Sequence, residues 1–535
     1  MHNIKDQQLL YDNAIERLKS GDFPSGIYSL YKALQIKKDT DVELEIASAY
    51  LDVGCISEAQ KYYIRVHNAQ PRNKEAYLGL INCYIEDNEQ ELANFYFMKG
   101  LDEKVLTAEE LDDFFVQQKI EEAPIKLYDS KDKSRVVEIA SKLMLGGDTA
   151  YAEQLLKSVA RPEIKQYTEI CSLLSLLYLN EKRFDDAAVY ADKVLEKDES
   201  HVFALACRIL VAYHNAFYTE MELYKSKLLA VDVKEEGLVV KVAVCMMNIG
   251  DAPNAEKYLR KLLDINYYDR TTLMSMIAVC GAQNKFDDAK KYAVSAHKLF
   301  PEDVEIRHMA TLVRNRDAET LAKIMSKGFD GKKWLKEIES FMVEHSALSK
   351  IENALKKDEE MAQKIKWLEQ TYPSRQQIEI LSFLAKSDNR RDETQRILLL
   401  PDFDLQAKKM ILKSMLISTK RKDFSLFTCG FLRKYKPKKL EPSVFADAYY
   451  TAYATMAFVG SKFDKNLYEA YEAVVGSDAK DATDANVVAA VMFYIAGGVN
   501  LIKSKKDSAE IFGVSEDDFM QFVYKAGLEK NYEFK

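Results

Sequence analysis

The sequence predicts an all-α fold, an α-solenoid of helical hairpins followed by further helical hairpins or a helical bundle. The 535 residues contain only 10 prolines and 19 glycines, too few for a fold with many tight turns, and 47% are apolar, enough for a large core. The second observation is a repeat. The phrase Phe-Asp-Asp-Ala stands at 184–187 and again at 286–289, a separation of 102 residues that equals three periods of 34.

Small residues keep this phase along the first half of the chain. A small residue in the second helix of a hairpin lets the two helix backbones approach each other closely. The stretch 202–235 keeps the spacing but has Met221 at the small position. Elsewhere the position is alanine, at Ala59, Ala93, Ala152, Ala187, Ala255 and Ala289.

Two other positions of the period have matching chemistry. About nine residues before each alanine, a large or apolar residue ends the first helix, namely Tyr50, Tyr84, Leu143, Tyr178, Met246 and Cys280. The turn between the two helices then has a residue that tolerates the left-handed backbone, at Gly54, Asn88, Gly147, Gly250 and Asn284. Lys182 is the exception.

This pattern resembles the tetratricopeptide repeat family over about residues 7–303. A weaker repeat opens the chain, and the best repeats are 40–73, 74–107, 133–167, 168–201, 236–269 and 270–303. The resemblance implies hairpins stacked into a superhelix, with first helices lining a concave surface that binds a protein or peptide.

Composition and the breaks in the repeat pattern predict five segments. N-terminal repeats occupy 1–107, an acidic insertion or connector follows at 108–132, and a second block of repeats occupies 133–320. Residues 321–440 are predicted as degenerate helical repeats or a helical domain, and 441–535 as a C-terminal helical domain. The fourth segment is basic, since 331–450 contains 24 Lys and Arg against 17 Asp and Glu although the whole chain has a net charge of −8.

The concave surface is the first candidate site. Its candidate partner-binding residues are Asn82, Val240, Val244, Met247, Met274 and Ala278, most of them apolar. Either a hydrophobic partner binds this groove, or helices of the same chain fill it.

The segment 420–439 is the second candidate, because basic residues alternate there with Phe424, Phe427 and Phe431. The phenylalanines have helical spacing, which favours a helix with these rings in a core and the lysines at its rim. The alternative is a nucleic-acid-binding surface, since cations neutralise phosphates and aromatic rings stack on bases. The candidate basic patch is Arg433, Lys434, Lys436, Lys438 and Lys439.

Residues 508–527 have the spacing of a helix-turn-helix, with Gly513 at the turn. The second helix would begin at Ser515 and continue with three carboxylates at 516–518. Acids in a first turn are typical of helix capping and would repel phosphates, so we expect a structural role instead of DNA recognition.

The sequence contains no recognisable motif for catalysis, cofactor binding or metal binding. Phosphate-binding loops, nucleophile elbows and zinc-protease motifs are absent, the seven histidines share no ligand spacing, and the seven cysteines form no Cys-x-x-Cys pair. We therefore expect no catalysis, cofactor or metal. The start lacks an apolar signal core and no apolar run is long enough for a membrane span, so we expect a cytoplasmic protein without membrane insertion.

The predicted function is a non-catalytic protein–protein interaction module, a scaffold, adaptor or peptide sensor. The alternative is a nucleic-acid-binding regulator that uses 420–439 or the helix-turn-helix-like segment.

Overall fold

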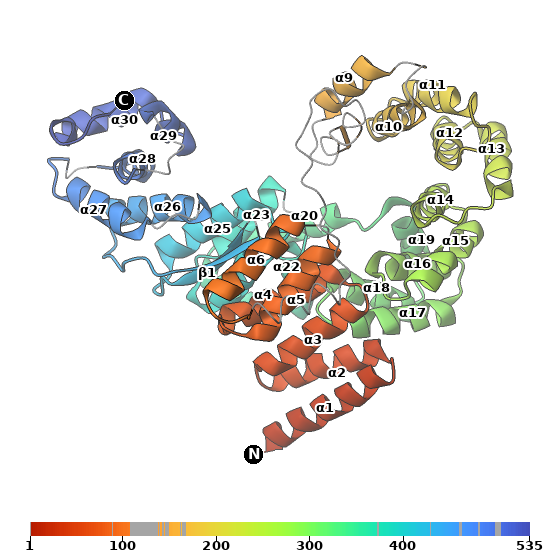
Figure 1. Ribbon diagram of the computed structural model, residues 1–535, viewed down its shortest axis with the longest axis horizontal. Coiled ribbons are helices and arrows are strands. Elements are labelled where there is room, and N and C mark those ends of the chain that lie inside the picture. Colours follow the sequence, from red (N-terminus) through yellow and green to blue (C-terminus); the bar gives the residue numbers. More distant parts are fainter. Residues whose placement is uncertain are drawn as a thin grey trace. The chain divides into compact units, whose positions relative to one another are not determined.

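The structure is a computed structural model, and Figure 1 shows its ribbon. It describes residues 2–87, 89–107, 137, 140, 141, 144, 149–160, 162, 167–371, 374–428, 430–459, 463–479, 482–497 and 504–534. The predicted insertion 108–132 lies outside the described residues, as do Asn88, Leu143 and Gly147. The chain divides into unit 1 (1–16, 29–111 and 331–535) and unit 2 (17–28 and 112–330).

Unit 2 is a curved series of helical hairpins. Its first helices follow the inner side of the curve and its second helices the outer side (Figure 1). The hairpins are α10 (Tyr167–Asn180) with α11 (Phe184–Leu195), α12 (Val202–His214) with α13 (Tyr218–Ala230), α14 (Glu236–Asn248) with α15 (Ala252–Ile265), and α16 (Arg270–Ala282) with α17 (Phe286–Leu299). Helix α9 (Thr149–Val159) precedes them, and α18 (Val304–Arg314) and α19 (Ala318–Lys327) follow.

The turns of these hairpins confirm the 34-residue period. Lys182, Ala216, Gly250 and Asn284 have φ angles of 61°, 58°, 79° and 60°, each in the left-handed region. Two of the four have side chains without a preference for that region, so hairpin geometry imposes the turn whatever the residue. The turn at Ala216 also shows that 202–235 is a repeat, although Met221 replaces the small residue.

The small positions lie where the two helices of each hairpin meet. Ala187, Ala255 and Ala289 have no exposed surface, and Met221 is 9% exposed. Space for a methyl group but not for a longer side chain explains why alanine recurs.

Replacing Ala289 with leucine is therefore expected to destabilise unit 2. Three extra heavy atoms must fit a contact that has no free surface, which costs about 1–3 kcal/mol of unfolding free energy. Urea unfolding followed by circular dichroism measures this. The control is Val294→Leu on the same helix, where 47% of the side chain is exposed. Equal midpoints for both variants would contradict the assigned phase.

Acidic pairs begin the second helices, as expected. Asp185 and Asp186 stand in the first turn of α11, and Asp287 and Asp288 in that of α17. Their charge complements the positive end of the helix dipole. The recurring pairs are therefore accounted for by helix starts.

Unit 1 combines N-terminal hairpins with the second half of the chain. Most of α1 (His2–Lys19) and α2 (Phe23–Ile36) belongs to it, followed by α3 (Thr40–Asp52) with α4 (Ile56–Ala69) and α5 (Lys74–Glu86) with α6 (Gln90–Asp102). The second half adds α20 (Gly331–His345), α21 (Leu348–Leu355), α22 (Glu359–Leu368), α23 (Arg375–Leu384), α24 (Arg391–Leu399), α25 (Leu405–Ser418), α26 (Val444–Val459), α27 (Asp464–Val475), α28 (Ala485–Ile495), α29 (Lys505–Ile511) and α30 (Glu516–Lys525).

The helix predicted within 420–439 is wrong. This segment forms an antiparallel hairpin of β1 (Phe424–Thr428) and β2 (Phe431–Tyr435), in which Thr428 is opposite Phe431. Gly430 makes the turn with a φ of 79°, and a Cβ there would lie 2.3 Å from Leu92 Cδ2 in α6. The sequence signal was the run of aromatic and apolar residues on both sides of a glycine.

Side chains replace a third strand along the outer edge of β1. The Gln395 amide in α24 accepts a hydrogen bond from the Ser425 N–H at 3.0 Å and donates one to the Ser425 carbonyl at 2.6 Å. The buried Lys408 ammonium donates to the Phe427 carbonyl at 2.7 Å. These contacts satisfy backbone groups that a two-stranded sheet leaves unpaired, so the hairpin is stable inside a helical unit.

The predicted helix-turn-helix spacing corresponds to α29 and α30. Gly513 has a φ of 67° in the turn, and the Asp518 N–H donates to Ser515 Oγ at 3.0 Å. Phe519 is fully buried. The acids at 516–518 thus lie in a capped first turn, as expected.

Among the described residues, no helix has both the length and the apolar composition required to cross a membrane.

Candidate functional site: an apolar inner face in unit 2

Equivalent positions of three consecutive first helices define one largely apolar stripe. On α14, Val240 and Val244 lie opposite its buried residues Val242 and Met246, and hence on the side of the helix away from α15. Adding the positions 34 residues earlier and later defines the inner-face stripe. It consists of Phe203, Ala206, Leu210, Tyr213, Gly237, Val240, Val244, Met247, Thr271, Met274, Ala278 and Gly281. The stripe contains no charged residue.

The middle of the stripe is open to solvent. Val240 is 41% exposed and Val244 47%, although both are aliphatic, and Met247 and Met274 are half-buried. Burying a valine side chain that is otherwise in water contributes up to about 1.5–3 kcal/mol. Helix α14 therefore offers a surface that favours an apolar partner.

Two predicted contact residues do not belong to this open surface. Ala278 is only 1% exposed, so its assignment as a partner contact is wrong. Asn82 lies half-buried in α5 of unit 1, whereas the other candidate residues belong to unit 2.

Helix α19 explains why Ala278 is buried. A Cβ on Gly281, one turn along the same face of α16, would lie 2.3 Å from Leu321 Cδ1. Leu321 and Met325, one turn apart on α19, are both buried, and Figure 1 shows α19 on the inner side beside α14 and α16. The groove was expected to be either filled by the chain's own helices or open to a partner. At α16 it is filled by α19, whereas at α14 it is open to solvent. Sequence reasoning missed α19, although Leu321 and Met325 have the spacing of one helix face.

At the other end of the inner-face stripe, residues of α12 are buried. Phe203 is 9% exposed and Ala206 5%, and the Lys241 ammonium lies 4.8 Å from the centre of the Phe203 ring. Lys241 is itself exposed, so it places a cation at the edge of the open stripe.

The cysteines near the stripe are inert. Burial raises the pKa of the Cys207 thiol to about 11 and that of Cys245 still further. Cys245 Sγ lies 3.7 Å from the Ala206 carbonyl, to which it donates a weak hydrogen bond. Protonated, buried thiols are poor nucleophiles and poor metal ligands. Among the described residues, no group of three His, Cys, Asp or Glu could hold a metal ion.

An ion-pair cluster around Glu256 joins neighbouring hairpins of unit 2. Burial raises the pKa of Glu256, but hydrogen bonds from Lys285, Arg260 and Gln283 outweigh it and lower the pKa to about 2. The Lys285 ammonium lies 2.7 Å from the carboxylate. This cluster connects α15 to the turn between α16 and α17, so its perturbed pKa reflects a structural contact.

The basic patch lies on and after β2. Lys434, Lys436, Lys438 and Lys439 are exposed, and Arg433 is half-buried beside the Phe431 ring at 5.2 Å. Phe424 and Phe427 are 3% and 2% exposed, and the Phe431 ring centre lies 4.5 Å from that of Phe95. The rings of Phe424 and Phe427 are therefore enclosed by the protein and unavailable for stacking on bases, whereas Phe431 is half-buried.

Comparison with known proteins gives distant likenesses to solved structures. No family model matches the chain, and no curated protein matches it. A tetratricopeptide repeat protein from Parabacteroides merdae is 15% identical with a TM-score of 0.27, covering 58% of this chain and 100% of that one. The pilF protein of Pseudomonas aeruginosa is 15% identical with a TM-score of 0.22, covering 43% and 93%, and yeast Tom70 is 12% identical with a TM-score of 0.23, covering 99% of both chains.

These TM-scores are low, so the fold assignment depends on the hairpins themselves. Paired helices, buried alanines and left-handed turns recur with one 34-residue phase. The protein is a helical-repeat protein with hairpins of the tetratricopeptide type.

Proposed function

We propose that unit 2 is a protein-binding module whose open stripe on α14 seats an amphipathic helix of a partner protein. The observation that supports this is α19. It is an amphipathic helix already seated on the same surface one hairpin further on, with Leu321 against Gly281. A partner helix with apolar residues at positions i and i+4 could use Val240 and Val244 in the same way.

The proposed role is that of a cytoplasmic scaffold, adaptor or peptide sensor without catalysis of its own. An uncharged stripe selects its partner by shape and apolar area, while Lys241 at the edge favours a partner with an acid on that side. Phe424 and Phe427, which are buried in the basic hairpin, give no support to the nucleic-acid alternative.

Replacing Val244 with aspartate is expected to abolish binding of a helical partner. Seating a helix would then bury an unpaired carboxylate, which costs several kcal/mol and lowers affinity at least tenfold. The assay compares proteins captured from the source cell by the parent chain and by Val244→Asp, using quantitative mass spectrometry.

The matched control is Val189→Asp. Val189 is also a valine, 51% exposed, and lies on the outer helix α11 of the same unit. At least one partner should be lost with Val244→Asp and retained with Val189→Asp, and a peptide of its helix should bind the parent chain directly. Identical capture by both variants, both folded by circular dichroism, would contradict the proposal.

A further inference from the structure

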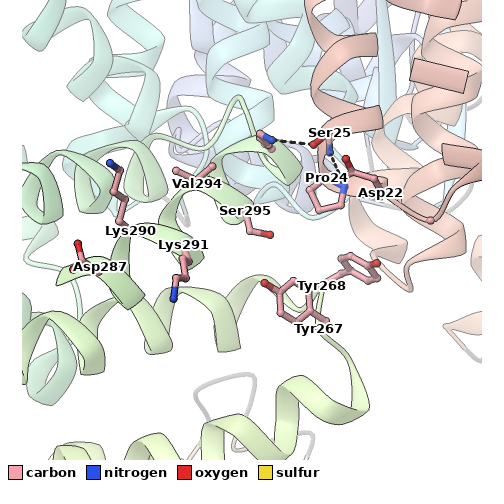
Figure 2. Close-up of a pocket in the computed structure, with 12 residues that line it drawn as sticks. Asp22, Pro24, Ser25, Tyr267, Tyr268, Asp287, Lys290, Lys291, Val294 and Ser295 are labelled. Carbon is pink, nitrogen blue, oxygen red and sulfur yellow. Dashed lines mark hydrogen bonds between the residues drawn. The ribbon is translucent and has the colours of Figure 1, made fainter. Parts of the chain in front are cut away.

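A second hollow in unit 2 lies away from the inner-face stripe. It has a volume of about 720 Å³ and is walled by α17, by the turn between α15 and α16, and by the start of α2 (Figure 2). Its lining is Gly21, Asp22, Pro24, Ser25, Tyr267, Tyr268, Asp287, Lys290, Lys291, Val294, Ser295 and Lys298. All of these residues belong to unit 2. We call it the α17 groove.

One face of α17 gives the groove an ordered pattern of charge. Lys291, Val294 and Lys298 follow each other at intervals of three and four residues, so they share a face. The two lysines are seven residues apart, which corresponds to about 10 Å along a helix axis. Between them Val294 is 47% exposed, and Tyr267 across the groove is 42% exposed.

Contacts between the walls hold the groove in shape. The Lys298 ammonium donates to Ser25 Oγ at 2.9 Å, and the Phe23 ring lies 5.8 Å from that of Tyr268. Asp22 accepts a hydrogen bond from the Ser25 N–H at 3.2 Å, so this carboxylate is engaged at the start of α2. The remaining acid of the lining, Asp287, lies in the first turn of α17, whereas Lys298 lies in its last turn.

We propose that the α17 groove binds an extended acidic segment of a protein partner, with two carboxylates three residues apart and an apolar side chain between them. A chain in the extended polyproline II conformation rises about 3.1 Å per residue with three residues per turn, so side chains three residues apart share a face and lie about 9–10 Å apart, which matches the two lysines. The apolar side chain would rest on Val294 and Tyr267. The α17 groove shares no residue with the stripe on α14.

The pattern of charge favours a peptide over a nucleic acid. A nucleic acid has a negative charge at every nucleotide, and Asp22 and Asp287 would repel some of its phosphates. A segment with two separated carboxylates can pair with Lys291 and Lys298 without contacting Asp22 or Asp287.

The test uses the full chain and a fluorescein-labelled peptide, Gly-Ser-Glu-Leu-Ala-Glu-Ser-Gly, followed by fluorescence anisotropy at two salt concentrations. Binding is expected to weaken with salt, and to be lost when both glutamates of the peptide are glutamine. Lys291→Glu should lower the affinity at least tenfold, and Val294→Ser about threefold.

The matched control is Lys323→Glu on α19. Lys323 is 65% exposed and pairs with Glu319 at 2.6 Å, much as Lys291 is 75% exposed and pairs with Asp288 at 3.0 Å. Equal losses for Lys291→Glu and Lys323→Glu would show attraction by overall charge only and overturn the proposal. Absence of binding to the parent chain would also overturn it. Self-association lost with Lys291→Glu, without peptide binding, would assign the groove to a second copy of the chain.

Discussion

Replacing Phe424 with alanine is expected to lower the free energy of unfolding by about 3–5 kcal/mol, because the cavity left by a buried phenylalanine collapses only partly. Phe424 is 3% exposed. Its ring centre lies 5.0 Å from that of Tyr435 across the hairpin and 6.2 Å from that of Tyr453 in α26. Urea unfolding of the full chain, followed by tyrosine fluorescence and circular dichroism, measures the effect.

The control for this change removes charge from the same hairpin. Lys434→Gln and Lys436→Gln alter exposed side chains and should leave the midpoint within about 0.5 kcal/mol of the parent. If Phe424→Ala were instead harmless to folding and destroyed a salt-sensitive complex with nucleic acid, the ring would be a stacking surface and the nucleic-acid alternative would regain support.

Acidification is expected to destabilise unit 1 through His67. The imidazole in α4 is 2% exposed, with the Tyr77 ring centre at 4.7 Å. Burial, and then the charges of Lys99 and Lys434, lower its pKa to about 4. The Lys99 ammonium lies 3.4 Å from Nε2, and because an ammonium can only donate, Nε2 accepts and Nδ1 carries the proton.

The sign follows from which state binds the proton. An unfolded histidine has a pKa of about 6.5, so below that pH the unfolded chain binds a proton that His67 in the folded chain does not bind. The unfolding free energy attributable to His67 should therefore fall as pH drops from about 6.5 to 4, by about 3 kcal/mol in all. Above pH 6.5 it should not change with pH.

Measurement requires the difference between two proteins, because carboxylates also titrate in this range. Urea midpoints of the parent chain and of His67→Gln, which cannot titrate, should converge as pH is lowered from 7 to 4.5. Parallel curves would show that folded His67 accepts its proton as readily as an unfolded histidine.

The repeat hairpins could be predicted from the sequence because their spacing expresses a local geometry. A small residue is required wherever two helices cross, and that requirement leaves alanines in phase. The turns were less visible. Lys182 and Ala216 adopt the left-handed backbone without being suited to it, since the helices on both sides fix the turn.

The β-hairpin was missed for a physical reason. All five residues of β1 are buried, so the alternation that identifies a half-exposed strand is absent. The phenylalanine spacing was compatible with a helix. Gly430 was the better guide, since it has a positive φ and no room for a side chain.

The candidate site depends in part on a contact that no single helix reveals. Exposure of Val240 and Val244 follows from their place opposite the buried side of α14. Burial of Ala278 follows from α19, whose Leu321 is distant in the sequence, so spacing within α16 could not predict it.

The seat of α19 on α16 has a consequence for competition. Because α19 is joined to α16 in the same chain through α17 and α18, it is present at its binding position at an effective concentration on the order of millimolar or higher, whatever the concentration of the protein. A free helix with equal intrinsic affinity would therefore almost never displace it. Partners that need the α16 position must bind far more tightly than α19 does, whereas those that use α14 meet no tethered rival.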